Sequence, residues 1–266
     1  MTLNFIKYPG GKFYLWKWIV GLFPDGYQQM RYVETFGGGA TVLLNKEPSA
    51  HEVLNEFDPK IWAIYKTIKN GCHRFVDDLS SLDYCEPLFA AAKTYGFTFG
   101  PDNTYNEAFT EFVIRRMSRG GYGKDFAWSD RLRGGIPGDM NAWQNALKKL
   151  PQVSARLQNV LLCNEDALTL IPSLDGPQTL FYCDPEYAAE TLVSKDPYRV
   201  KFSTENHIEL SEILDRVQGQ AVVSGYNCPL YERLYTNWNR HSREVASHAG
   251  QTKTKGRKIE CCWTNY

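Results

Sequence analysis

The sequence predicts an α/β fold: a parallel β-sheet with helices on its faces, interrupted by a helical insert. Residues 1–71 and 159–266 alternate strand-like and helix-like segments, an order typical of parallel sheets. Residues 72–158 show helical periodicity and no evident strand. A chain of 266 residues can hold one large α/β domain with a smaller inserted one. We therefore predict a core built from 1–71 and 159–266, with an inserted subdomain over 72–158.

The first half of the predicted core contains two β-α units. Residues 31–36 have the character of a strand, three glycines at 37–39 form a turn, and a helix is expected from Ala40 onward. Residues 51–55 predict a second strand. Apolar residues then recur at helical spacing over 59–69, which predicts the next helix.

The second half continues the same alternation. One helix is predicted over 206–217, and the polar residues 247–258 are expected to form a mobile loop. Apolar runs predict four further strands, over 159–163, 179–183, 221–224 and 258–263.

Composition narrows the class of protein. Thirty Lys and Arg balance thirty Asp and Glu, so any phosphate-binding surface has to be local. No run of 18 apolar residues and no apolar signal segment occurs, so we expect no membrane span. The seven cysteines show no zinc-ligand spacing, which favours reduced thiols in a cytoplasm and no metal site. Cys261 and Cys262 are expected to be buried in a strand.

The glycine-rich turn predicts a ligand site. Gly37 to Gly39 follow a strand and precede a helix, where the backbone can approach a ligand closely. Glu56, 19 residues after Gly37, ends the next strand, where an acid can bind both hydroxyls of a ribose. The turn departs from G-x-G-x-x-G and no phosphate-binding P-loop follows. An adenosyl ligand without a phosphate is therefore favoured.

An Asp-Pro-x-Tyr tetrad predicts the chemistry. An apolar strand ends in Asp184, Pro185, Glu186 and Tyr187, at a point where side chains face the ligand crevice of a parallel sheet. The Asp184 carboxylate and the Pro185 carbonyl can accept both hydrogens of one amino group. This favours a pyramidal nitrogen whose lone pair can attack a methyl group, while Tyr187 can stack on an extruded base.

With these motifs in order, the chain resembles the Dam-like, alpha-group adenine-specific DNA methyltransferases, in particular phage and prophage members. Residues 7–12 resemble the family's N-terminal cofactor motif, 34–39 its glycine motif, 54–59 its ribose motif, 165–167 its adenine-facing acid motif and 184–187 its catalytic tetrad. Further landmarks are matched by Glu190, Thr191, Tyr198, His207 and residues 260–266.

The resemblance implies a Rossmann-like S-adenosylmethionine-dependent methyltransferase core with an inserted helical target-recognition subdomain. It implies base flipping in double-stranded DNA by a monomer, in the cytoplasm of a bacterium or of a phage-infected host. Catalysis falls on Asp184, Pro185 and Tyr187. Cofactor binding is expected from Tyr8, Gly10, Lys12, Phe36, Gly37, Gly39, Glu56, Asp166 and Asp184.

Two basic segments are candidates for DNA contact. Within 115–133, six basic residues stand against two acidic ones, with aromatic residues between them, a pattern that suits phosphates and unstacked bases. The expected DNA-binding residues are Arg115, Arg116, Arg119, Tyr122, Lys124 and Arg131. The second run, over 253–258, suits either DNA contact or a solubilising loop.

Three alternatives stay open at this level. Glu186 stands where the family has proline, so a DNA-binding homologue with weak or no catalysis is one alternative. Amino methylation of cytosine is another, although its tetrad more often begins with Ser than with Asp184. An NAD-dependent oxidoreductase would use the glycine turn and leave the tetrad unexplained. His207 is expected to be a helix residue with no catalytic role. A restriction–modification role, protection of a phage genome and regulation of expression are equally compatible with these motifs.

Overall fold

The computed structural model describes residues 2–191, 199–246 and 257–266. Tyr198 and most of the predicted polar loop, with Lys253 and Lys255, lie outside the described residues.

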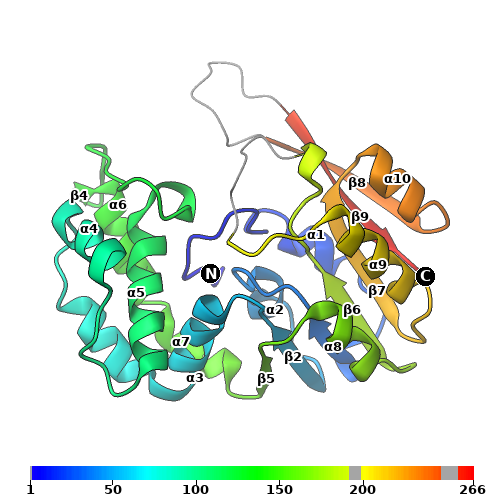
Figure 1. Ribbon diagram of the computed structural model, residues 1–266, viewed down its shortest axis with the longest axis horizontal. Helices are drawn as coiled ribbons and strands as arrows, with labels where there is room; N and C mark the ends of the chain where they lie inside the picture. The colour runs from blue at the N-terminus through cyan, green and yellow to red at the C-terminus, as the bar shows by residue number, and fades with distance from the viewer. Residues whose placement is uncertain (1, 192–198, 247–256) are drawn as a thin grey trace.

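A seven-stranded, mostly parallel sheet forms the centre of the molecule (Figure 1). In sheet order its strands are β5 (Val160–Cys163), β2 (His51–Asn55), β1 (Arg31–Glu34), β6 (Thr179–Cys183), β7 (Gln220–Tyr226), β9 (Arg257–Thr264) and β8 (Asn239–Ala246). The first five are parallel, β9 runs antiparallel to β7, and β8 runs antiparallel to β9. This arrangement confirms the predicted α/β, Rossmann-like fold class.

Helices cover both faces of the sheet. On one face lie α1 (Trp16–Val20), α2 (Thr41–Asn45) and the first part of α3 (Pro59–Ser80); the other face packs against α8 (Ala167–Leu174), α9 (Thr204–Leu214) and α10 (Pro229–Leu234). Alternate residues of β1 show the division, since Tyr32 belongs to the first apolar cluster and Val33 to the second. Strands buried on both faces explain the continuous apolar runs in the sequence.

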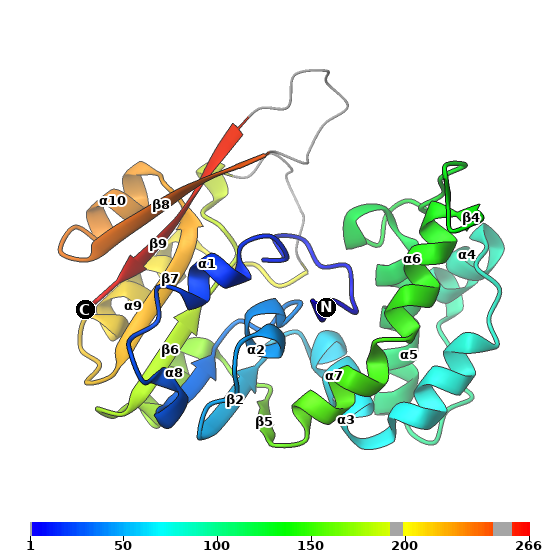
Figure 2. The ribbon, with the colours of Figure 1, turned by 180° about the vertical axis from the view of Figure 1, so that it is seen from behind.

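The insert is helical and lies beyond the β5 edge of the sheet (Figures 1 and 2). Its helices are α4 (Glu86–Tyr95), α5 (Asn103–Met117), α6 (Gly138–Leu147) and α7 (Leu150–Leu157). Short 3-10 turns occur at Tyr27–Gln29, Arg119–Gly121 and Ala189–Thr191. A hairpin of two-residue strands, β3 (Leu132–Arg133) and β4 (Ile136–Pro137), was not expected, because such short pairs leave no alternation to detect.

The helix α3 runs from the core into the insert. It changes direction at Gly71, whose φ of −143° and ψ of 36° are not helical, next to the predicted boundary at residues 71 and 72. The apolar cluster nevertheless continues across that point, since Tyr65 on the core side and Phe75 on the insert side belong to the same buried group. The division into two domains therefore remains a prediction.

A buried charge cluster joins the end of the insert to the sheet. The Glu52 carboxylate on β2 accepts hydrogen bonds from Lys46 Nζ at 2.6 Å and from Arg156 Nη2 on α7 at 2.7 Å. Arg156 also donates to the Leu43 carbonyl at 2.8 Å. Each cation compensates the buried carboxylate, so α7 is held against the core by a paired group.

Candidate active site

One pocket lies at the carboxyl ends of β1, β2 and β6, where the strand order reverses between β1 and β6. In doubly wound sheets this position forms a crevice outside the strands. The pocket is lined by the N-terminal loop (8–12), the glycine turn with its flanks (34–42), residues 56–57, 166–167 and 184–187, a short segment at 200–202, Tyr182 and Asn206. Every residue expected to bind cofactor or act in catalysis lines this pocket.

The glycine turn brings backbone close to the N-terminal loop. Gly38 has a φ of 48°, and a Cβ built on it would lie 2.9 Å from the Tyr8 ring. A side chain at this position would therefore be strained and would collide with Tyr8. The next residue but one, Ala40, also takes a left-handed conformation, with φ of 45°.

Two buried carboxylates hold the glycine turn and the helix α2 that follows it. Glu34 accepts hydrogen bonds from the Tyr32 hydroxyl at 2.7 Å and from the Leu43 amide at 2.8 Å, and burial raises its pKa to about 8. Glu56 accepts from the Gly38 amide at 2.6 Å. The Gly38 amide of this turn is thus already bound by a carboxylate of the protein itself.

Glu56 meets the expectation of an acid facing the pocket at the end of β2. Its carboxylate also accepts from the Asp58 amide at 2.8 Å, and burial raises its pKa to about 7. Asp58 instead caps α3 through the Lys60 amide and pairs with Arg199, so its side chain is committed elsewhere. Asp166 caps α8 by accepting from the Leu168 amide at 2.9 Å, at the edge of the pocket.

The Asp184 carboxylate is held from two sides. Its Oδ2 lies 2.7 Å from Lys12 Nζ, and its Oδ1 accepts from the Ser224 hydroxyl on β7 at 2.7 Å. Lys12 also donates to the Gly10 carbonyl at 2.9 Å. Burial opposes the charge on Lys12, but the carboxylates of Asp184 and Glu260 outweigh it and raise its pKa above the usual value. Lys12, which the sequence predicted to bind the cofactor, is therefore also the ion-pair partner of Asp184.

Tyr187 is fixed before any base arrives. Its hydroxyl donates to Glu260 at 2.8 Å, and its ring meets Tyr226 edge-on at 4.6 Å. The Lys12 ammonium lies 4.9 Å from the ring centre. A base that stacks on Tyr187 has to share this ring with Lys12.

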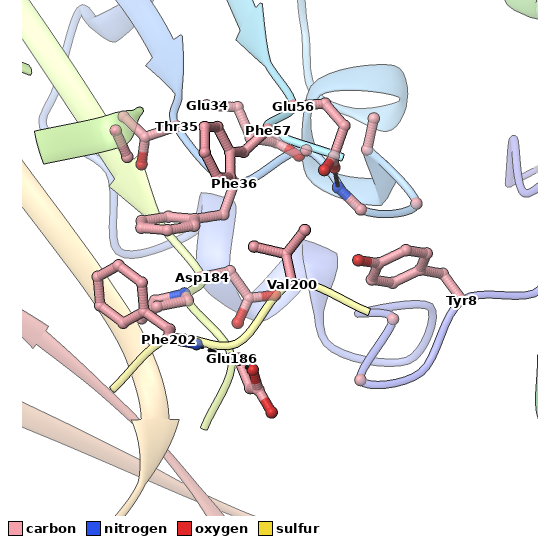
Figure 3. Close-up of a pocket in the computed structure, with 18 of the residues that line it drawn as sticks. Tyr8, Glu34, Thr35, Phe36, Glu56, Phe57, Asp184, Glu186, Val200 and Phe202 are labelled. Atoms are coloured by element: carbon pink, nitrogen blue, oxygen red, sulfur yellow. Dashed lines mark hydrogen bonds between the residues drawn. The ribbon is translucent and has the colours of Figure 1, made fainter. Parts of the chain in front are cut away.

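The Glu186 carboxylate points away from the middle of the pocket (Figure 3). Its Oε2 accepts a hydrogen bond from the Phe202 amide at 3.1 Å. His207 lies buried in α9, where its Nδ1 is 3.1 Å from the Tyr231 hydroxyl and burial lowers its pKa to about 4. The expectation that His207 is a helix residue is confirmed.

The structure divides the expected DNA-binding residues into two groups. Arg119, Tyr122, Lys124 and Arg131 are exposed on the insert. Arg115 and Arg116 are buried, which corrects the expectation that they contact DNA directly.

The two buried arginines make contacts inside the protein. Arg115 pairs with Glu111 at 2.7 Å, donates to the Gly121 carbonyl at 2.9 Å and lies over the Tyr8 ring. Arg116 donates to the Ala142 carbonyl, and burial lowers its pKa to about 10. Neither guanidinium is presented to a phosphate.

Ser224 and residues 200–202 belong to the site although no motif placed them there, and so does Glu260, which was matched as a family landmark without a role. Ser224 lies in an apolar strand and gives no signal. Glu260 is a lone acid in the apolar run 259–263, and a charge in a buried strand indicates a specific partner. Cys261 and Cys262 in the same strand are buried, as expected.

The fold and the site together define a class: a Rossmann-like methyltransferase whose pocket is lined by an Asp-Pro-x-Tyr tetrad. The chain belongs to the D12 class N6 adenine-specific DNA methyltransferases, whose family model matches residues 8–248. It is therefore an adenine-specific DNA methyltransferase, which excludes the cytosine and oxidoreductase alternatives.

Individual relatives are more distant. The chain is 23% identical over 257 residues to the Type II methyltransferase M.MjaIII of Methanocaldococcus jannaschii, covering 88% of each chain. A solved structure, the putative methyltransferase yhhF from Escherichia coli, is 12% identical and is covered to 90%, with 97% of this chain aligned. The TM-score of 0.37 is too low to establish a shared fold.

Within residues 2–191, 199–246 and 257–266, no three His, Cys, Asp or Glu side chains gather as metal ligands. No helix in the described part of the chain is long and apolar enough to cross a membrane.

Proposed function

We propose that the pocket binds S-adenosylmethionine and that Asp184, Pro185 and Tyr187 present the amino group of a flipped adenine to it. The observation that carries the proposal is the position of Asp184 beside the glycine turn, in the same pocket as Glu56. When bound, S-adenosylmethionine supplies an electrophilic methyl group on a sulfonium.

The residues of the pocket suit such a ligand. Five acidic side chains, those of Glu34, Glu56, Asp166, Asp184 and Glu186, line it against the two lysines Lys12 and Lys201. This excess of acids complements a ligand carrying a positive sulfonium and an amine. Gly38 lets the turn lie close against the Tyr8 ring at the pocket wall, because a Cβ there would lie 2.9 Å from that ring. Glu56 faces the pocket at the end of β2, where a ribose would lie, and Asp166 lies at the rim, where the adenine of the ligand would end.

The target amine is positioned by acceptors of this chain. The Asp184 carboxylate and the Pro185 carbonyl accept its two hydrogens, so the nitrogen lone pair turns toward the methyl group. Ser224 and Lys12 hold Asp184 in that orientation, each at 2.7 Å. Lys12 stays charged because its pKa is raised, and it therefore keeps an anionic acceptor beside the amine.

DNA is proposed to lie along the exposed face of the insert. Arg119, Lys124 and Arg131 offer positive charge, and Tyr122 and Trp128, each 44% exposed, offer aromatic surface. Contacts of this kind would offset the few kcal/mol that base extrusion costs. We further propose that the enzyme acts as a monomer in the cytoplasm. Restriction–modification is the favoured context, since M.MjaIII is a Type II methyltransferase.

The test is transfer of labelled methyl groups from S-adenosylmethionine to mixed-sequence duplex DNA, followed by digestion and identification of the nucleoside. Methyladenine is expected, and it would show that the tetrad works with Glu186. Cofactor binding without any incorporation would instead favour a recognition-only protein.

The Asp184→Ala variant is expected to lose methyl transfer at least about a hundredfold, because one of the two amine acceptors is gone. Cofactor affinity, measured by calorimetry, should persist. Asp184→Asn is the matched variant, since it keeps the side-chain shape without the charge beside Lys12. Loss of cofactor binding in both variants would assign Asp184 to the cofactor and not to the target base.

A further inference from the structure

A short segment, residues 199–202, lines the pocket opposite the glycine turn, and we name it the strap. Val200, Lys201 and Phe202 are part of the pocket wall. Figure 3 shows Val200 between Tyr8 and the tetrad, on the side of the pocket facing Phe36 and Glu56. The strap begins twelve residues after Tyr187, the last residue of the tetrad, so its place at the pocket requires contacts of its own.

One end of the strap is held by Arg199. Its guanidinium donates to both Asp58 carboxylate oxygens, at 3.0 and 2.8 Å, and to Glu111 at 2.7 Å. Asp58 caps α3 shortly after the end of β2, and Glu111 lies on α5 of the insert. Both acids are at least nine-tenths buried, so they are fixed points for the arginine.

The other end is held at Phe202. Its amide donates to Glu186 Oε2 at 3.1 Å, and its ring packs edge-on against Phe36 at 5.2 Å and against His207 at 4.8 Å. The backbone bond depends on a side-chain acceptor at position 186. The proline of the usual tetrad has none.

We propose that Glu186 is a positioning residue that holds the strap against the pocket, with Arg199 as its counterpart at the other end. The replacement of proline by glutamate thus stabilises the cofactor-binding wall and leaves the amine acceptors Asp184 and Pro185 unchanged. This inference rests on the proposed function of the pocket.

The first experiment measures hydrogen exchange of the Phe202 amide in the ligand-free full-length protein. The amide should be protected in the wild type, lose about tenfold of its protection in Glu186→Ala, and recover it in Glu186→Gln, whose amide oxygen can still accept. Equal exchange in all three proteins would overturn the anchoring role of Glu186, whether or not the protein binds a cofactor.

The second experiment measures the dissociation of S-adenosylmethionine and the methylation kinetics of the same variants. Glu186→Ala and Arg199→Gln should each raise the dissociation rate and the KM for S-adenosylmethionine about tenfold, while kcat at saturating cofactor changes less than twofold. Glu186→Pro should behave as Glu186→Ala, and Glu186→Gln should restore the wild-type values.

Matched controls are available at the C-terminal end of α9 and just beyond it. Glu212 and Arg216 are exposed and pair with each other at 3.9 Å, so Glu212→Ala and Arg216→Gln remove the same charges from a remote surface and should change nothing. A fall in kcat at unchanged cofactor affinity in Glu186→Ala would place Glu186 at the target amine and overturn the proposal. If the wild-type protein binds no S-adenosylmethionine, the proposed function fails. The hydrogen-exchange result alone still tests whether Glu186 holds the Phe202 amide.

Discussion

Single residues in this pocket perform two tasks at once. Lys12 both orients Asp184 and covers the ring of Tyr187. Glu56 both holds the glycine turn through the Gly38 amide and faces the pocket. Because such groups are buried, their protonation is tied to the geometry that surrounds them.

Ionisation of Glu56 is expected to change the stability of the ligand-free protein and its affinity for S-adenosylmethionine in opposite directions as the pH rises. Burial raises its pKa to about 7, so the stability that the protonated carboxyl contributes is fully present below the unfolded pKa and is lost as pH rises through 7. A ribose that binds the ionised carboxylate should, by contrast, be held several-fold more tightly at pH 8 than at pH 6. Calorimetry with S-adenosylmethionine and thermal melts of the ligand-free protein would measure both trends.

Glu56→Gln is the control for this prediction, because it cannot ionise and keeps the shape of the side chain. Its affinity should change less across the same pH range than that of the wild type, with Glu34 as the remaining buried acid of the pocket, and should be weaker than that of the wild type at pH 8. An identical pH profile in both proteins would assign the ribose contact to another group.

At the scale of elements, the sequence predicted the parts with strong patterns. The strands β2, β5, β6, β7 and β9 and the helices α3 and α9 were expected because they are apolar runs or have helical spacing. β8 was missed because this edge strand is largely polar, from Asn239 to Glu244, and therefore lacks the apolar pattern. β1 ends at Glu34, two residues before the predicted end.

The burial of Arg115 and Arg116 could not follow from a count of charges. Their segment has a net positive charge, which suited DNA equally well. The pair Glu111 and Arg115, four residues apart on one helix face, was a signal for an internal ion pair. The role of Arg199 depends on contacts with residues 141 and 88 positions away, and no local pattern could reveal it.

The buried charge cluster of Glu52, Lys46 and Arg156, which joins α7 to β2, gives a prediction at this scale. Glu52→Ala leaves Lys46 and Arg156 without their buried partner, and it should lower the free energy of unfolding by about 3–5 kcal/mol. Denaturant titration would measure the loss. As a comparison, Glu212→Ala removes an exposed carboxylate and should cost less than about 1 kcal/mol. Equal effects would mean that the buried cluster contributes no stability to the joint.

At the scale of the whole molecule, DNA affinity is expected to come from one exposed face of the insert. Ala substitutions of Arg119 and Lys124 should each weaken duplex binding across all sequences. If each side chain contacts one phosphate, the slope of log affinity against log salt should fall by about 0.9 per side chain. Binding measured at several salt concentrations tests this.

Arg116→Ala provides the contrasting case. Because its guanidinium is buried against the Ala142 carbonyl, it should lower stability while leaving the salt slope of the folded protein unchanged. A salt slope reduced to the same extent as in Arg119→Ala would mean that Arg116 reaches DNA in the complex.

The kinked helix α3, which belongs to both parts of the molecule, has a consequence for any attempt to change the target sequence by recombination. A chimaera that replaced residues 72–158 alone would cut this 22-residue helix near its middle and divide one apolar cluster between two parents. A functional graft would have to carry the donor's own version of α3 and α7, together with the side chains they bury. An exchange of the proposed recognition subdomain therefore has to include part of the scaffold, whereas single substitutions on the exposed loops leave these buried contacts unchanged.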